Sequence, residues 1–227
     1  MRAKSQSRSS KPIGSEAAAR AEVISTALQM SRSGLSPGRS GNVSRRWREG
    51  MLITPTGMAY DELKPADVSF VDLEGKPAGK RKPSSEWHFH LAIYNARSDV
   101  GAVVHTHSMH AVVLACVGKP VPAFHYMVAV AGGDDIPCVP YATFGTDALA
   151  RHVVKGLAAR NACLMAHHGM VAVGATLPGT LELAAEVETL CEQYWKVLAL
   201  GRPALLPAAE MAEVIERFKG YGQNAQA

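Results

Sequence analysis

Val103-Val104-His105-Thr106-His107 is the stretch that decides the fold of this chain. The apolar residues leading into it predict a buried strand, and the end of that strand carries two imidazoles one residue apart. Because side chains alternate between the two faces of a strand, His105 and His107 should project on the same side. Two ligands of one metal ion need that arrangement.

A third imidazole is available in His167-His168, which follows the apolar run 162–166 and precedes Gly169. The two neighbours point to opposite faces, so only one of them can join His105 and His107. We predict His168, because Gly169 beside it lets the backbone come close to the site. Three neutral imidazoles with one open position form a catalytic zinc site. The alternative is that these histidines are scattered over the core and the surface.

The composition predicts a globular chain without a nucleic-acid-binding surface. A length of 227 residues lies between one and two domains, and no linker-like stretch divides the chain, so we predict one domain. Removing the four basic residues that precede Glu16 from the 24 Lys and Arg leaves 20, equal to the 20 acidic residues. A neutral body lacks the clustered positive charge that nucleic-acid binding requires.

The basic segment 1–15 is rich in Ser, Arg and Lys and has no apolar run, so it predicts a disordered tail rather than a signal peptide, with the domain covering residues 16–227. No apolar run reaches the ~18 residues that spanning a membrane requires. The four cysteines are far apart in apolar surroundings, which predicts reduced core residues in a cytoplasmic protein. They are Cys116, Cys138, Cys163 and Cys191.

Hydrophobic periodicity predicts helices alternating with short strands. Strands near 43–47, 51–53 and 68–72 lie too close in sequence for helical crossovers and should pair antiparallel as hairpins. Further strands are predicted at 136–139, 162–166 and 170–173, and helices at 17–28, 83–94, 108–117, 146–159, 177–200 and 208–219. The pattern predicts an α/β layer fold in which helices cover a largely antiparallel sheet.

Three polar turns are candidate anion sites. Ser84-Ser85-Glu86 opens a predicted helix, whose free N–H groups and hydroxyls can bind an anion, although helix capping explains the same residues. Gly41-Asn42 and Thr56-Gly57 are small enough to bring backbone N–H groups up to a phosphate, although each is also compatible with an ordinary loop. None matches a Walker or dinucleotide motif, so any phosphate site here is of another kind.

Glu86 is the candidate acid/base. It follows the two serines directly, so an anion bound there would lie close to its carboxylate. A carboxylate beside a Lewis-acidic metal can remove a proton next to a carbonyl that the metal polarises. His90 lies one turn further along the same helix face, so His90 and also His88 are competing candidates for a metal ligand. His110 is predicted to be supporting or structural, and His152 to lie on a helix surface.

Together these motifs resemble the class II aldolase/adducin family, over roughly residues 16–222. The resemblance rests on Ser40-Gly41-Asn42, Thr54-Pro55-Thr56-Gly57, Ser84-Ser85-Glu86-Trp87, His105-Thr106-His107 and His167-His168-Gly169. His125-Tyr126-Met127 and residues 141–146 resemble the fuculose-phosphate-like aldolases within it. The resemblance implies a three-layer single domain with a central, mostly antiparallel sheet covered by helices.

For the site, the resemblance implies one Zn²⁺ per subunit, bound by His105, His107 and His168, with Glu86 at the metal as acid/base. The phosphate of dihydroxyacetone phosphate would be bound by Gly41, Asn42, Thr56, Gly57, Ser84 and Ser85. The resemblance also implies a homotetramer with active sites at subunit interfaces. In it Tyr126 would donate a proton in a neighbouring subunit's site, and Tyr221 would lie in a C-terminal tail that closes over the site.

The implied reaction is reversible cleavage of a ketose 1-phosphate, such as L-fuculose 1-phosphate, to dihydroxyacetone phosphate and a short aldehyde. Alternatives on the same scaffold are a 5-deoxyribulose-1-phosphate aldolase and a sugar-phosphate epimerase, decarboxylase or dehydratase. A non-enzymatic adducin-like protein should lack the metal ligands, and all three histidines are present. Arg39-Ser40 and Thr106 depart from the family's Thr-Ala and Asn, and Arg39 could add a cationic contact near the phosphate.

Overall fold

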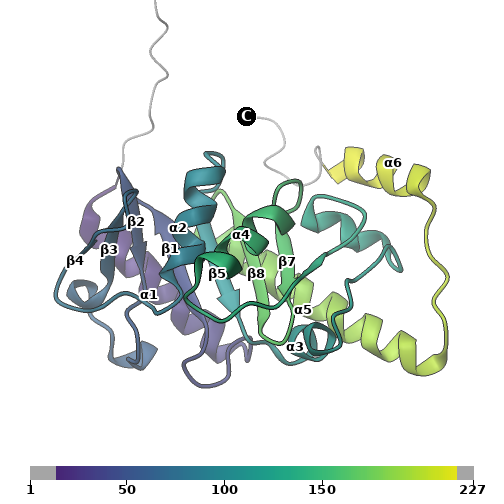
Figure 1. The fold of residues 1–227 in the computed structure, drawn as a ribbon, viewed down its shortest axis with the longest axis horizontal. Helices are drawn as coiled ribbons and strands as arrows, with labels where there is room; N and C mark the ends of the chain where they lie inside the picture. The colour runs from purple at the N-terminus through teal and green to yellow at the C-terminus, as the bar shows by residue number, and fades with distance from the viewer. Residues whose placement is uncertain (1–13, 219–227) are drawn as a thin grey trace, which may run out of the picture.

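A central eight-stranded sheet with the order β4-β3-β2-β1-β5-β8-β7-β6 forms the middle of the protein (Figure 1). The computed structural model describes residues 14–218, so almost all of the predicted tail and Tyr221 lie outside the described residues. Every described pairing is antiparallel except that of β6 with β7. The strands are β1 Asn42–Arg46, β2 Gly50–Ile53, β3 Ser69–Asp72, β4 Pro77–Ala78, β5 Ala102–Thr106, β6 Cys138–Val139, β7 Ala162–Met165 and β8 Gly169–Gly174.

Helices cover both faces of this sheet, which confirms the predicted α/β class with a mostly antiparallel sheet (Figure 1). Helices α1 and α5 pack on one face and α2 and α4 on the other. The helices are α1 Glu16–Arg32, α2 Trp87–Ala96, α3 Met109–Cys116, α4 Asp147–Gly156, α5 Leu177–Leu200 and α6 Ala208–Phe218, with short 3-10 helices η1 Tyr60–Glu62, η2 Pro65–Asp67 and η3 Tyr126–Ala131.

The alternation of side chains along the central strands builds two separate cores. On β5, Ala102 and Val104 join the core under α1 and α5, whereas Val103 joins the core under α2 and α4. His105 follows Val103 at a spacing of two and therefore faces the α2 side. Fully buried strands of this kind are apolar on both faces, which explains the near-continuous runs of Val, Ala and Leu in the sequence.

Capping side chains set the helix starts. Thr146 at the start of α4 accepts a hydrogen bond from the Leu149 N–H, and Thr176 at the start of α5 accepts one from Gly179. The predicted span of α5 matches the observed one, while α4 ends at Gly156, before the predicted residue 159. The short helix η3 was not predicted, because its six residues are too few for a helical period to emerge.

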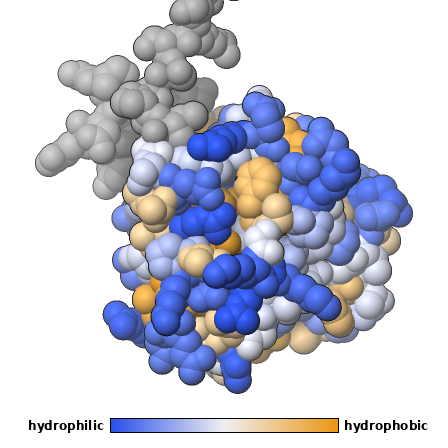
Figure 2. All heavy atoms as spheres, turned by 90° about the vertical axis from the view of Figure 1, so that its left-hand side faces the viewer, coloured by the Kyte–Doolittle hydropathy of each residue, from blue (hydrophilic) through white to orange (hydrophobic). Residues whose placement is uncertain are grey.

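The edge strand β4 is only two residues long and contains Pro77, which limits pairing with another chain. The view onto this end of the molecule shows mostly hydrophilic residues with small hydrophobic patches (Figure 2). Among the described helices, none combines the length and apolar character needed to cross a membrane.

We expect the core on β7 to carry much of the stability. Leu164→Ala should lower the free energy of unfolding by about 2–5 kcal/mol, because the side chain is fully buried and its removal leaves a cavity. Leu200→Ala is the matched control, since Leu200 is 91% exposed, and should change it by less than about 0.5 kcal/mol. Urea denaturation at fixed protein and metal concentrations measures both, and equal losses would contradict the packing described here.

Candidate metal centre

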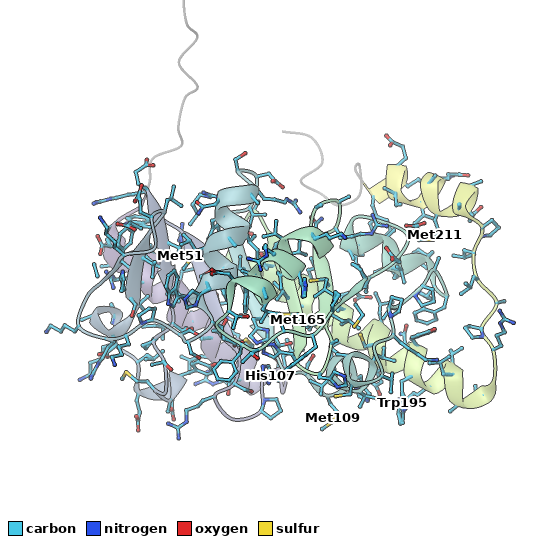
Figure 3. All side chains as sticks on the ribbon, viewed as in Figure 1. Met51, His107, Met109, Met165, Trp195 and Met211 are labelled. Carbon is cyan, nitrogen blue, oxygen red and sulfur yellow. The ribbon has the colours of Figure 1, made fainter. Side chains whose placement is uncertain are left out.

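One end of the sheet brings three distant segments of the chain together. His105 lies on β5, directly opposite Asn42 of β1 on one side and Val171 of β8 on the other. The turn between β7 and β8 carries His168, and the start of α2 carries Glu86. In Figure 3 the labelled His107 lies at this lower end of the sheet, whereas Met51 and Met165 are buried between the layers.

Glu86, His105, His107 and His168 form one cluster whose potential ligand atoms all lie within 4.8 Å of one another. The Glu86 carboxylate lies 3.1 Å from Nε2 of His105 and 2.9 Å from Nε2 of His168. The Nε2 atoms of His105 and His107 are 3.0 Å apart. The structure thus brings together the three predicted histidines and the predicted carboxylate, and among the described residues it is the one group of at least three such side chains able to hold a metal.

The donor set fits a divalent cation. His105 Nδ1 lies 2.8 Å from the carbonyl oxygen of Met170, and this carbonyl can only accept, so Nδ1 carries the proton and Nε2 keeps its lone pair. Nε2 of His107 lies 3.0 Å from Nε2 of His105, close enough for one cation to take both nitrogens as ligands. Glu86 Oε1 is buried and lies 2.9 Å from Nε2 of His168. Imidazole nitrogens and a carboxylate are ligands that suit zinc.

Electrostatics keep these groups in the forms that bind metals. Burial, together with the neighbouring His105 and His168, lowers the pKa of His107 to about 3, so its ring is neutral at physiological pH. Burial opposes the charge on Glu86, but the adjacent His105 and His168 outweigh it and hold the pKa of this carboxyl well below its usual range. The cluster therefore presents a neutral His107 ring and an ionised Glu86 carboxylate.

Gly169 explains why His168 and not His167 joins the cluster. A Cβ at Gly169 would lie 2.3 Å from the Thr106 carbonyl oxygen and 3.2 Å from the His107 ring, so only glycine allows β8 to approach the end of β5 this closely. His167 adopts a positive φ of 56° at the turn and is exposed. The backbone reversal thus turns His167 toward the surface and His168 toward the other two histidines.

A cavity of about 360 Å³ opens beside the cluster. It is lined by Glu86, His107 and His168 and by all six of the residues that the sequence predicts to bind phosphate, Gly41, Asn42, Thr56, Gly57, Ser84 and Ser85. Arg39 also lines it and donates a hydrogen bond to the Gly57 carbonyl at 3.0 Å. Among residues 14–218 it is the only Arg or Lys side chain on the cavity wall, so it could supply a positive charge to a bound anion.

Asn42 is part of strand β1 rather than of the predicted loop, and its side chain is buried. Its amide Nδ2 donates to Glu86 Oε2 at 2.9 Å, and its Oδ1 accepts from His90 at 2.5 Å. Gly41 before it has no room for a side chain, because a Cβ would lie 2.7 Å from the His105 carbonyl oxygen. Sequence reasoning missed the contact of Asn42 with Glu86, which depends on the pairing of β1 with β5.

The other histidines lie outside the cluster. His90 is buried beside Asn42, and His88 stacks on Trp87 with ring centroids 4.0 Å apart. His110 bonds the carboxylate of Glu188 at 2.9 Å, and His152 bonds a backbone carbonyl at the surface.

Tyr126 is half exposed on η3 and does not line the cavity of its own chain. It borders a separate groove with Met127 and helix α6.

The chain belongs to the class II aldolase and adducin family, because the family model described as the Class II Aldolase and Adducin N-terminal domain matches residues 21–195. Families of this class use a divalent metal, and the cluster of Glu86 with three histidines could bind one. The chain is therefore an enzyme, a metal-dependent aldehyde-lyase of class II, as the sequence predicted.

Three individual relatives are similar to this chain over most of its length. A 5-methylthioribulose-1-phosphate/5-deoxyribulose-1-phosphate aldolase of Rhodospirillum rubrum is 54% identical over 213 residues, which are 94% of this chain and 96% of the relative. An L-fuculose phosphate aldolase of Escherichia coli K12 is 47% identical over 202 residues, 88% of this chain and 94% of the relative. A solved structure of an L-fuculose 1-phosphate aldolase superposes with a TM-score of 0.87 at 38% identity, covering 91% of this chain and 100% of that one.

We expect His90 to make the metal-free protein sensitive to acid. Burial, and to a lesser extent the neighbouring His105, lowers the pKa of His90 from 6.5 to about 3 in the folded protein. Between pH 6.5 and about 3 the imidazole binds more protons in the unfolded chain than in the folded protein. The stability that the neutral His90 contributes is therefore full above pH 6.5 and is lost as the pH falls toward 3. The loss that His90 causes should be about 1.4 kcal/mol per pH unit between pH 6 and 4.

Urea denaturation of chelator-treated protein at several pH values measures this slope. His90→Gln should reduce the slope by that amount, because the titrating group is gone. Ile93→Ala, on the same helix and equally buried, should lower stability at every pH without changing the slope. A His90→Gln slope equal to that of the wild type would contradict the assignment.

Proposed function

We propose that the protein is a zinc-dependent aldolase that reversibly cleaves a ketose 1-phosphate, such as L-fuculose 1-phosphate, to dihydroxyacetone phosphate and a short aldehyde. The observation that carries this proposal is that Glu86, His107 and His168 of the cluster line the same cavity as the small polar residues of the predicted phosphate site. A phosphorylated substrate bound there would have its phosphate at the polar turns and its ketone at the cluster. The printed names of the relatives support the same class of substrate.

In this proposal His105, His107 and His168 hold one Zn²⁺ per subunit. The ion supplies the positive charge that stabilises negative charge on the substrate's oxygens as the carbon–carbon bond breaks. Three imidazoles with an adjoining cavity suit a catalytic site, because they leave a position open for substrate. His105 is buried on β5 inside the sheet, which fixes the position of this ligand before the substrate binds.

Glu86 would handle the proton on the dihydroxyacetone phosphate side. In the synthesis direction the ionised carboxylate would remove a proton from the carbon that bonds to the aldehyde, and in the cleavage direction the protonated carboxyl would return a proton to that carbon. Asn42 donates to its Oε2, which also lies 3.1 Å from Nε2 of His105, and its Oε1 lies 2.9 Å from Nε2 of His168. Tyr126 of a neighbouring subunit in a homotetramer would exchange the proton on the aldehyde oxygen, and Tyr221 would lie in a tail that covers the site.

The phosphate would be bound in the same cavity by Gly41, Asn42, Thr56, Gly57, Ser84 and Ser85. Ser84 and Ser85 precede α2, so the positive end of the helix dipole and the free N–H groups of its first turn favour an anion there. Arg39 would add a cationic contact. Binding energy from the phosphate would hold the reacting carbon against Glu86.

A second candidate substrate differs only in the aldehyde. Tyr141 and Phe144 are 59% and 63% exposed on the cavity rim, and Ala142 lies between them. An apolar rim favours an aldehyde that carries a methyl or methylthio group over one that carries a hydroxyl. 5-Deoxyribulose 1-phosphate and 5-methylthioribulose 1-phosphate, both of which the name of the Rhodospirillum rubrum relative contains, would yield such aldehydes.

The test is an assay of the purified protein with these ketose 1-phosphates, measuring released dihydroxyacetone phosphate. We expect cleavage that a chelator abolishes and that added Zn²⁺ restores, because the buried carboxylate and imidazoles cannot replace the cation's charge. Comparing L-lactaldehyde, acetaldehyde and methylthioacetaldehyde in the synthesis direction would identify the aldehyde. Full activity in the metal-free protein, or turnover without carbon–carbon cleavage as in an epimerase, would overturn the proposal.

Glu86→Gln separates the acid/base role from metal binding. The substitution keeps the size of the side chain and should lower turnover by about 10²–10⁴-fold while the protein still binds Zn²⁺. Gly14→Ala is a control far from the site, since a Cβ there would meet open space. Unchanged turnover in zinc-loaded Glu86→Gln would remove Glu86 from the mechanism.

A further inference from the structure

A buried chain of hydrogen bonds runs from Glu86 away from the cavity and ends at Tyr94. We propose that His90, Ser44 and Tyr94 are positioning residues, which fix the Asn42 amide and through it hold the Glu86 carboxylate in its reactive orientation. The proposal rests on the proposed acid/base role of Glu86. None of these three side chains lines the cavity, so they act on the reaction only through Asn42.

The contacts form one continuous line. Asn42 Nδ2 donates to Glu86 Oε2 at 2.9 Å, and His90 Nε2 lies 2.5 Å from Asn42 Oδ1. His90 Nδ1 lies 2.7 Å from Ser44 Oγ, which lies 2.9 Å from the Tyr94 hydroxyl. Three of the four distances are those of ordinary hydrogen bonds, and the contact of His90 with Asn42 is shorter.

The direction of each hydrogen bond follows from the direction of the one before it. An ionised carboxylate can only accept, so Asn42 must turn its NH₂ toward Glu86 and its carbonyl oxygen toward His90. His90 must then donate from Nε2 and accept at Nδ1. Ser44 therefore donates its proton to His90, and Tyr94 donates to Ser44. The outer members thus select one tautomer of His90 and one orientation of the Asn42 amide.

The secondary structure places these side chains side by side. Asn42 and Ser44 are two residues apart on β1 and share a face of the strand. Glu86, His90 and Tyr94 are successive residues at a spacing of four on the face of α2 that packs on this strand. A strand period of two and a helix period of four therefore put polar partners opposite each other inside an otherwise apolar layer.

Burial makes each link in this chain of hydrogen bonds costly to break. Asn42, Ser44, His90 and Tyr94 are at most 3% exposed, and a buried polar group without a partner is destabilising. Breaking one link therefore leaves groups that no water can satisfy, and the remaining members rearrange. An amide in the middle cannot pass a proton along the line, so the chain orients Glu86 and does not conduct protons.

Hydrogen–deuterium exchange into dihydroxyacetone phosphate, measured in D₂O without any aldehyde, isolates the proton transfer assigned to Glu86. We expect His90→Phe to lower the maximal exchange rate by about 10–100-fold, a loss typical of residues that orient others at a metal site. The KM for dihydroxyacetone phosphate and the zinc content should stay close to those of the wild type. Ser44→Ala, a smaller change, should lower the rate in the same way.

Ile93→Ala is the matched control, because Ile93 lies buried on the same helix and makes no polar contact in the chain. It should destabilise the protein without slowing exchange. A rate loss in Ile93→Ala as large as that in His90→Phe, or wild-type exchange rates in both His90→Phe and Ser44→Ala, would overturn the proposal.

Nitrogen NMR of ¹⁵N-histidine-labelled, chelator-treated protein measures the tautomer of His90 without requiring enzyme activity. We expect the His90 signals, assigned by their loss in His90→Phe, to show the Nε2–H tautomer, and Ser44→Ala to shift the population away from it. The Nδ1–H tautomer in the wild type would overturn the proposal. Absence of exchange in the wild type together with the expected tautomer would instead count against the proposed aldolase function.

Discussion

The main constraint in this structure is the convergence of three imidazoles and a carboxylate at one end of the sheet, with Glu86 and His105 buried and His107 and His168 partly buried. Burial opposes the Glu86 charge, and a divalent cation bound by these side chains would balance it. The sheet supplies the rigidity that keeps the four side chains together, since His105 lies on the central strand β5 between β1 and β8.

Small residues decide how closely the backbones approach at this point. Gly169 lets β8 reach the end of β5, and Gly41 lets β1 reach it from the other side. Both contacts lie beside His105, so metal geometry and sheet packing depend on the same few atoms. The start of α2 then adds Glu86 from above the sheet and the two serines that face the cavity. A substitution at either glycine would therefore disturb both the packing of the sheet and the metal site.

Much of this was predictable from the sequence. The two-residue spacing of His105 and His107 follows from the strand period, and Gly169 correctly favoured His168 over His167 as the third side chain of the cluster. The hairpins and the long helix α5 followed from turn residues and periodicity. The pairing of β1 with β5 was not predictable, since residues 42 and 105 are far apart in the chain, and neither was the link from Asn42 to Glu86. The spacing of Glu86, His90 and Tyr94 indicates a polar face on one helix. The residues of β1 that form hydrogen bonds with this face could not be identified without the register of the sheet.

The central claim is that His105, His107 and His168 bind one divalent cation beside Glu86. Anomalous X-ray diffraction at the zinc absorption edge, from crystals of the purified zinc-loaded protein, tests it directly. We predict one anomalous peak per subunit, about 2.0–2.1 Å from Nε2 of each of the three histidines. Zinc bound elsewhere, or a cluster without an anomalous peak, would contradict it.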